Sequence, residues 1–313
     1  MLGSLLERIP LLIMITGALV GIAGTLVGSF LVLSGRSMLS DAISHSIILG
    51  IVVVWLITGQ QTGPIQTIGA AVTGLLTVFV TQALVRTRRM RNDAAIGLVF
   101  PVFFALGVLL LNLYARDVHI DEHTVLLGEI GFIWLDNVTL AGFELPRSLV
   151  AMSLITLVNL VFVALFYKEL KLATFDPMLA RALGFAPGVL SYGLLLLTSV
   201  TAVAAFDAVG VILFVAFVIV PPATAYLLTE RLWLMLVIGC LVSVFASVIG
   251  YILANHWDVS IGGMMAVMTG AAFSLAFVFG PQHGLIPRWW RGRRRAAESR
   301  EAIPAATSPN RPG

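Results

Sequence analysis

The sequence predicts an all-α membrane protein, a polytopic bundle of eight or nine transmembrane helices. Of its 313 residues, 59% are hydrophobic and only 11% are charged, whereas soluble domains carry about a quarter charged residues. The apolar runs are continuous and about twenty residues long, which is the length that an α-helix needs to cross a bilayer. A transmembrane β-barrel would instead show alternating segments of roughly ten residues. Composition and run length therefore both indicate helical spans.

Nine apolar runs mark the candidate spans. They are 10–33, 38–58, 64–85, 94–113, 148–167, 188–206, 208–228, 232–254 and 261–280. The sixth and seventh are nearly continuous, since only Asp207 and Gly210 interrupt them. A re-entrant pair or a broken helix at this point would reduce the count to eight. Asp207 then either faces water at a turn or lies near a transport path, as in transporters with discontinuous helices.

Basic residues are concentrated in alternate connections, which predicts the orientation of the chain. Four arginines occur in 86–93, three basic residues in 168–187, and five arginines in 288–295, whereas 59–63 and 255–260 have none. The positive-inside rule places the basic segments and the C-terminus in the cytoplasm. With nine spans, the N-terminus lies outside.

The remaining composition excludes several classes of protein. Cys240 is the single cysteine, so neither a disulfide framework nor a thiolate metal cluster is available. The two lysines, Lys168 and Lys171, do not follow a glycine, which rules out a P-loop. ATP would therefore have to be bound by another chain. The basic segments report orientation rather than a nucleic-acid partner. Residues 1–287 form the transmembrane domain, and 288–313 have the composition of a disordered cytoplasmic tail.

Asp41 and His45 are the first candidate site. They lie four residues apart in 41-DAISH-45, at the start of the second span. On a helix this spacing places both side chains on one face, with Cβ atoms about 5–6 Å apart. A carboxylate oxygen and a neutral imidazole nitrogen both bind manganese, iron or zinc. Ionisable groups within membrane spans are costly and indicate function.

A structural interpretation of the same residues stays open. Ser37 or Ser40 would cap the helix, Asp41 would favour its positive N-terminus, and His45 would face a neighbouring helix. One pair also provides too few ligands for a metal site. A two-fold dimer around a central path would bring together two carboxylates and two imidazoles.

Two connections provide further candidates. His119, Asp121 and His123 would share one face of an extended segment in the connection predicted to be outside. They form either a metal-receiving or docking surface, or a solvated linker. On the cytoplasmic side, 177–184 reads as a short helix that starts with proline and ends at a glycine. Its apolar face would either enter a groove on another protein or pack on its own bundle.

The chain resembles the metal-ion permeases of bacterial ATP-binding-cassette importers, the group that handles manganese, zinc and iron. The resemblance covers about residues 15–285. It is carried by 41-DAISH-45, 93-DAAIGLVFPVFFALGVLLL-111, 125-VLLGEI-130, 168-KELKLATFDPMLARALG-184 and 205-AFDAVGVILFVAFVIVPPATA-225. One departure is Ser40, which stands where many family members have glycine.

The resemblance implies a multi-pass protein of the bacterial inner membrane that is not itself an enzyme. It implies a permease dimer, formed with a second copy or a paralogue, together with two ATPase subunits and an extracytoplasmic solute-binding protein. It also implies that Asp41 and His45 coordinate the transported metal, with no permanently bound cofactor. The similarity is strongest to the manganese/iron branch, so manganese ranks first, with iron and zinc behind.

The resemblance further assigns a coupling role to the segment after the fifth span. The residues that match the family's coupling element, which docks on the ATPase, are Phe175, Asp176, Ala180 and Gly184. Two alternatives from other classes are an ion-coupled secondary metal transporter and an intramembrane zinc enzyme. The second lacks an H-E-x-x-H motif or a nearby general base.

Overall fold

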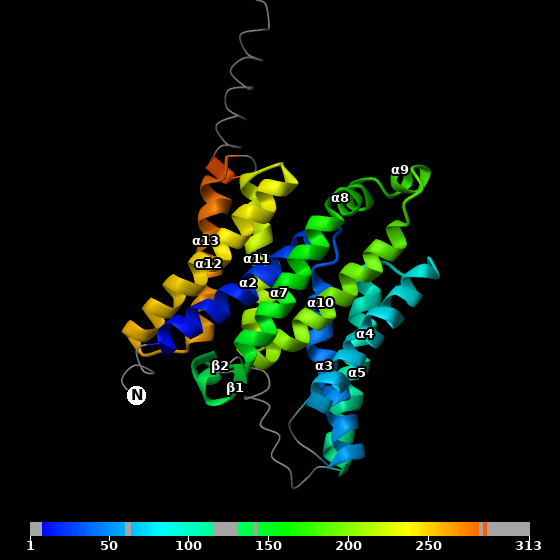
Figure 1. Ribbon diagram of the computed structural model, residues 1–313. Coiled ribbons are helices and arrows are strands. Elements are labelled where there is room, and N and C mark those ends of the chain that lie inside the picture. Colours follow the sequence, from blue (N-terminus) through cyan, green and yellow to red (C-terminus); the bar gives the residue numbers. More distant parts are fainter. Residues whose placement is uncertain (1–7, 60–63, 115–129, 141–142, 282–283, 287–313) are drawn as a thin grey trace, which may run out of the picture.

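Nine helices long and apolar enough to cross a membrane make up most of the described chain (Figure 1). The computed structural model describes residues 8–59, 64–114, 130–140, 143–281 and 284–286. The spans are α2 (Ile9–Leu33), α3 (Met38–Thr58), α4 (Pro64–Arg86), α5 (Asn92–Tyr114), α7 (Arg147–Leu165), α10 (Pro187–Val209), α11 (Val211–Leu228), α12 (Leu232–Trp257) and α13 (Ile261–Phe279). The predicted helical bundle is therefore confirmed.

Gly210 decides between eight spans and nine. Its backbone adopts φ 80° and ψ 170°, ending α10 and starting α11 at the same residue. This conformation is essentially confined to glycine. The chain reverses direction there, so that α11 runs back up through the bundle (Figure 1), and the two helices contact one another. The continuous apolar run 188–228 is consequently a pair of spans joined by a one-residue turn.

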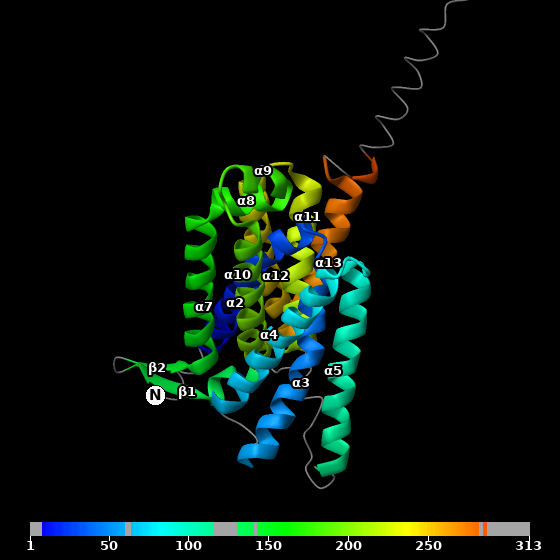
Figure 2. The same cartoon turned by 90° about the vertical axis from the view of Figure 1, so that its right-hand side faces the viewer.

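Helix α2 lies at the centre of the bundle. It is the most buried of the nine spans and contacts α7, α10, α11 and α12 (Figure 2). Buried polar groups join it to its neighbours, since the hydroxyls of Thr25 on α2 and Ser243 on α12 are 2.8 Å apart. Asn159 on α7 donates from Nδ2 to Thr201 on α10 at 2.9 Å. Such hydrogen bonds hold helices together where lipid gives no hydrophobic drive.

A close contact between α2 and α11 explains how a double proline is tolerated inside a span. Pro222 has no N–H, so the carbonyl of Val218 one turn earlier loses its helical partner. That carbonyl points at Gly28 of α2, where a Cβ atom would overlap the oxygen. Glycine thus allows the backbones to meet and brings its Cα–H groups to the carbonyl.

Substitution of Gly28 by alanine should therefore destabilise the bundle. The added methyl must displace the backbone of α11, and overpacking of this kind costs about 1–3 kcal/mol. Thermal unfolding of the purified protein would show a lower midpoint. Gly270→Ala on α13 is the matched control, because a Cβ there meets nothing within 4 Å. Equal midpoints for the two variants would contradict the packing described.

Helices α3, α4 and α5 form a group on one side of the bundle (Figures 1 and 2). A Cβ at Gly50 of α3 would overlap the carbonyl of Gly69 on α4, and one at Gly107 of α5 would lie 2.9 Å from the amide nitrogen of Leu49. Small residues let α3 pack closely between the other two. They fix the helix that carries Asp41 and His45.

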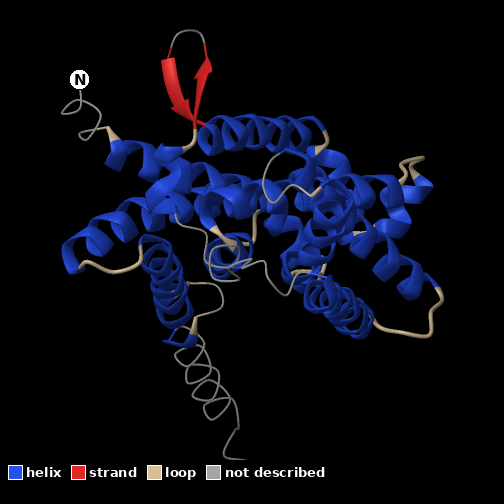
Figure 3. Cartoon of the chain, turned by 90° about the horizontal axis from the view of Figure 1, so that it is seen from below, coloured by secondary structure: helices blue, strands red, loops and turns tan. Residues whose placement is uncertain are grey.

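Short elements lie at the two ends of the bundle. At one end are η1 (Ile130–Leu135) and the antiparallel hairpin of β1 (Asn137–Leu140) and β2 (Phe143–Pro146), which stands apart from the helices (Figure 3). We call this the hairpin end. At the other are α8 (Tyr167–Phe175) and α9 (Pro177–Ala182), and we call it the α9 end. Sequence analysis predicted α9 but neither α8 nor the hairpin.

Candidate metal site

Asp41 and His45 lie together on α3, as their spacing predicts. Asp41 is in the first turn and His45 one turn further, with 3.6 Å between Nε2 of the histidine and Oδ1 of the aspartate. This distance exceeds a good hydrogen bond. Two ligand atoms can share one cation when they are closer than twice the metal–ligand distance of about 2.1 Å. The pair is therefore spaced to hold a metal ion between its members.

Two aromatic side chains of α5 contact one side of the His45 ring. Its ring centroid lies 5.8 Å from that of Phe100 and 6.0 Å from that of Phe104, the second in an edge-to-face arrangement. The two phenylalanines are four residues apart and so share a face of α5. Sequence analysis did not assign them to the site, although they occur in the 93–111 motif. They restrict the imidazole on one side and leave the pair accessible on the other.

The polar side of the pair remains open. The side chains of His45 and Asp41 are 35% and 38% exposed within the single chain. No group of three or more His, Cys, Asp or Glu that could hold a metal occurs among the described residues. Within the described part of the chain, the position thus offers one carboxylate and one imidazole as candidate ligands.

The structural interpretation of this sequence is wrong in one part, the capping of α3 by a serine. Ser37 precedes α3, but its side chain makes no capping hydrogen bond. The hydroxyl of Ser40 donates to the carbonyl of Ser37 at 2.9 Å, so it does not accept from a helix N–H. Asp41 still lies where the helix dipole favours a negative charge. His45 faces the neighbouring helix α5, as the structural interpretation also predicted.

The short helix predicted at 177–184 is present as α9, with defined caps at both ends. Oδ1 of Asp176 accepts hydrogen bonds from the backbone N–H groups of Met178 and Leu179, at 3.1 and 2.9 Å. At the other end Gly184 has φ +84°. The amide of Phe185 donates to the carbonyl of Ala180 at 3.0 Å. This is the Schellman arrangement that glycine favours.

The apolar side chains of this region point outward. Met178 is 80% exposed, and Phe175, Leu179 and Leu183 are exposed as well, whereas Ala180 is completely buried. Of the four residues matched to the coupling element, Phe175, Asp176 and Gly184 are exposed and Ala180 is buried. Asp176, Ala180 and Gly184 shape and seat the helix.

Two other sequence-predicted positions have different outcomes. Asp207 lies near the end of α10, three residues before the Gly210 turn, and interacts electrostatically with Arg147 and Asp136. Arg147 and Asp136 also form an ion pair at 4.0 Å. Asp207 thus belongs to a polar group at the hairpin end. The cluster of His119, Asp121 and His123 lies outside the described residues.

The fold and the site define a class of protein. The described chain combines nine apolar spans, a carboxylate and an imidazole one turn apart on one of them, and an exposed apolar helix outside the bundle, which are features of a membrane transport protein. The chain belongs to the ABC 3 transport family, whose sequence model matches residues 10–280. The resemblance found in the sequence is confirmed.

Individual relatives carry the same assignment. The chain is 45% identical to the manganese transport system membrane protein MntD of Bacillus subtilis, over 88% of this chain and 94% of that one. It is 47% identical to the zinc transport system membrane protein TroD of Treponema pallidum, over 88% and 75%. The solved structure of PsaBC from Streptococcus pneumoniae in complex with Fab aligns with a TM-score of 0.74, at 27% identity, over 94% and 100%.

Proposed function

We propose that this chain is the membrane permease subunit of an ATP-binding-cassette importer that takes up a divalent transition metal ion. The observation that carries the proposal is the Asp41–His45 pair, placed at 3.6 Å on a span of a chain in this transport family. A permease makes and breaks no bond, so the chain itself needs no catalytic group. Hydrolysis of ATP belongs to a separate ATPase subunit.

Manganese is the first candidate for the transported ion, with zinc and iron as alternatives. Carboxylate and imidazole suit all three, and a thiolate, which would favour softer metals, is not part of the pair. The 45% identity to a manganese transport protein supports manganese, and the 47% identity to a zinc transport protein keeps zinc in consideration. The metal is cargo, bound transiently. Binding must be strong enough for entry and weak enough for release.

A second permease, either another copy or a paralogue, would complete the site. The open side of Asp41 and His45 would face the matching pair of the partner across a two-fold axis. Two oxygens and two nitrogens would then converge on one path. This arrangement is supported by the described residues, among which no group of three or more candidate ligands occurs.

The α9 end faces the cytoplasm in the proposed orientation. Arg36, the arginines of 86–91, both lysines and Arg181 all lie at this end, as the positive-inside rule requires of a cytoplasmic face in a bacterial membrane. The C-terminus would be cytoplasmic, with residues 288–313 as a tail beyond a permease domain of 1–287. Asp41 then lies in the inner half of its span.

The two ends of the bundle would bind two different partner proteins. The exposed apolar side chains of α9 would dock on the ATPase, and the hairpin end, with the 115–129 connection, would receive a metal-loaded solute-binding protein. ATP-driven movement of α9 would alternate the access of the Asp41–His45 site between the two sides. Phe175 would contact the ATPase directly.

Whole-cell metal content tests the proposed function. A strain lacking this gene should contain less manganese by elemental analysis, and a plasmid copy should restore it. Deletion of the associated ATPase gene should cause the same loss. Normal uptake without that ATPase would instead favour the ion-coupled carrier. An unchanged content of manganese, zinc and iron in the deletion strain would refute metal import.

A further inference from the structure

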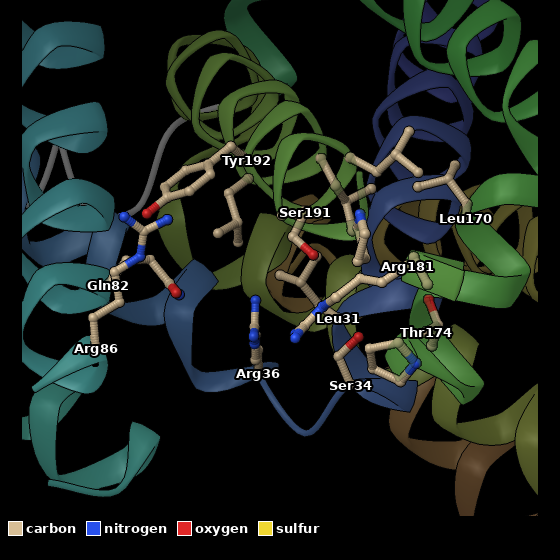
Figure 4. A pocket seen from close by; sticks show the side chains of 17 residues that line it. Leu31, Ser34, Arg36, Gln82, Arg86, Leu170, Thr174, Arg181, Ser191 and Tyr192 are labelled. Atoms are coloured by element: carbon tan, nitrogen blue, oxygen red, sulfur yellow. The ribbon is translucent and has the colours of Figure 1, made fainter. Parts of the chain in front are cut away.

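A second polar site lies at the α9 end, separate from Asp41 and His45. It is a cavity of about 370 Å³ (Figure 4). Its lining comes from the end of α2, the α2–α3 connection, the end of α4, helices α8 and α9, and the start of α10. The size is at the lower end of the range for small-molecule sites. The cavity is therefore formed by segments that are distant from one another in the sequence.

Three arginines from three of these segments line the cavity. They are Arg36 of the α2–α3 connection, Arg86 of α4 and Arg181 of α9. In Figure 4 the side chains of Arg36 and Arg181 extend into the same space, and Arg86 lies beside the ring of Tyr192. The guanidinium carbon of Arg86 is 5.2 Å from that ring centroid. Tyr192 thus helps to hold Arg86 at the edge of the cavity.

Within the part of the chain that the structure describes, no carboxylate balances the positive charges of the cavity. The lining includes no aspartate or glutamate. Among the described residues, none of the three arginines forms an ion pair with a carboxylate. Burial lowers the pKa of the Arg36 guanidinium, an effect that the nearby Tyr192 partly opposes. A partly buried arginine stays charged and is costly without a partner.

We propose that this cavity binds a phosphate group, with Arg36, Arg86 and Arg181 as its ligands. A phosphate offers several charged oxygens in different directions, and guanidinium groups pair with such oxygens through two parallel hydrogen bonds. Hydroxyl groups of Thr174 and Ser191 also line the cavity and could supply further donors.

The position of the cavity indicates the source of the phosphate. It lies at the ends of spans on the face that the proposed orientation places in the cytoplasm, where basic pockets between helices bind anionic lipid head groups. Leucines from α2, α8 and α10 line the same space. An anionic phospholipid head group satisfies both the charge and the location. A soluble phosphate ester shares the recognition chemistry, and the experiment below separates the two.

Occupancy would tie the coupling helix to the metal-binding helix. Arg181 is on α9, and Arg36 lies five residues before Asp41. A phosphate held by both would bridge these segments at one point. The proposal does not depend on metal transport, because its readout is the binding of the phosphate.

The test measures apparent affinity from thermal unfolding of the full chain in neutral detergent. The probes are phosphatidylglycerol, phosphatidylcholine and glycerol 3-phosphate, each titrated separately. Phosphatidylglycerol should raise the unfolding midpoint, and phosphatidylcholine should not. Arg36→Gln and Arg181→Gln should each weaken the apparent affinity by at least about tenfold, the loss expected for a charge-assisted hydrogen bond. Arg89→Gln, which removes a charge from the neighbouring connection, should leave affinity unchanged.

Each result decides one point. A response to glycerol 3-phosphate as strong as that to the lipid assigns a soluble phosphate as the source. Ser191→Glu places a carboxylate in the cavity and should give a folded protein whose unfolding midpoint no longer rises with phosphatidylglycerol. This variant tests the proposal even if the arginine variants do not fold. No response in the unaltered chain, or an undiminished one in Arg36→Gln and Arg181→Gln, overturns the proposal. The proposal is also overturned if Arg36→Gln and Arg181→Gln lose ATPase binding but keep their response to phosphatidylglycerol. The arginines would then be a protein-docking site.

Discussion

Replacing Asp41 with Asn and His45 with Gln in one chain is expected to reduce manganese uptake by at least about 100-fold. Both changes keep the side-chain size but remove the charged oxygen and the imidazole that would bind the ion. Even substitution of residues that contact only the ligands of a metal lowers metal affinity or activity about 10–100-fold. A symmetric dimer would lose four ligands at once. Radioactive manganese uptake by cells expressing each variant measures the effect, with membrane levels compared by immunoblot.

Two controls separate ligand loss from a helix-terminus effect. Asp93→Asn removes a carboxylate from the first turn of α5 at the same end of the bundle and should leave uptake near normal. Asp41→Asn and His45→Gln should each cause most of the loss alone, since two ligands of one ion are not additive. Metal affinity that is unchanged in an Asp41→Ala, His45→Ala double variant would end the assignment of this pair.

Met178→Glu is expected to abolish uptake while leaving metal binding intact. This side chain is 80% exposed on α9, and a charge placed there would be buried on docking without a partner. Affinity for the ATPase should fall by at least about tenfold, the usual minimum for a central apolar contact. Co-purification with the ATPase and metal binding to the purified permease are measured in parallel.

Met178→Leu keeps the volume and apolar character, and it should retain uptake. Changes at Ala180 or Gly184 should also abolish uptake, through a different physical cause. A bulky residue at the buried position 180 lifts α9 from the bundle, and a side chain at the left-handed position 184 strains the C-cap by about 1–2 kcal/mol. Equal uptake by Met178→Glu and the unaltered chain would refute coupling through this helix.

The sequence is sufficient to predict the spans because a bilayer imposes both length and apolarity on each of them. The predicted ends differ from those of the structure by three residues or fewer. The one ambiguity, at 188–228, depends on the backbone conformation of Gly210, which hydropathy does not report. The β1–β2 hairpin was missed because its strands have only four residues each, too few for their alternation of polar and apolar residues to stand out.

The candidate site was predictable only where it is local in sequence. The spacing of Asp41 and His45 fixes their common face, and the Pro177 and Gly184 signals fix both ends of α9. The contacts of Phe100 and Phe104 with His45 depend on how α3 packs against α5, which a single sequence does not reveal. The cavity arginines come from three distant segments for the same reason.

The link between α2 and α3 restricts how the metal pair can move. Only residues 34–37 separate the two helices. The amide of Arg36 donates to Leu31 of α2 at 2.8 Å, and the carbonyl of Arg36 accepts from Leu39 of α3 at 3.0 Å. A connection that is hydrogen-bonded to both helices moves with them and does not act as a hinge. In the proposed permease, rotation of α2 would therefore carry Asp41 and His45 with it, and the bending that opens one side of the path would occur elsewhere.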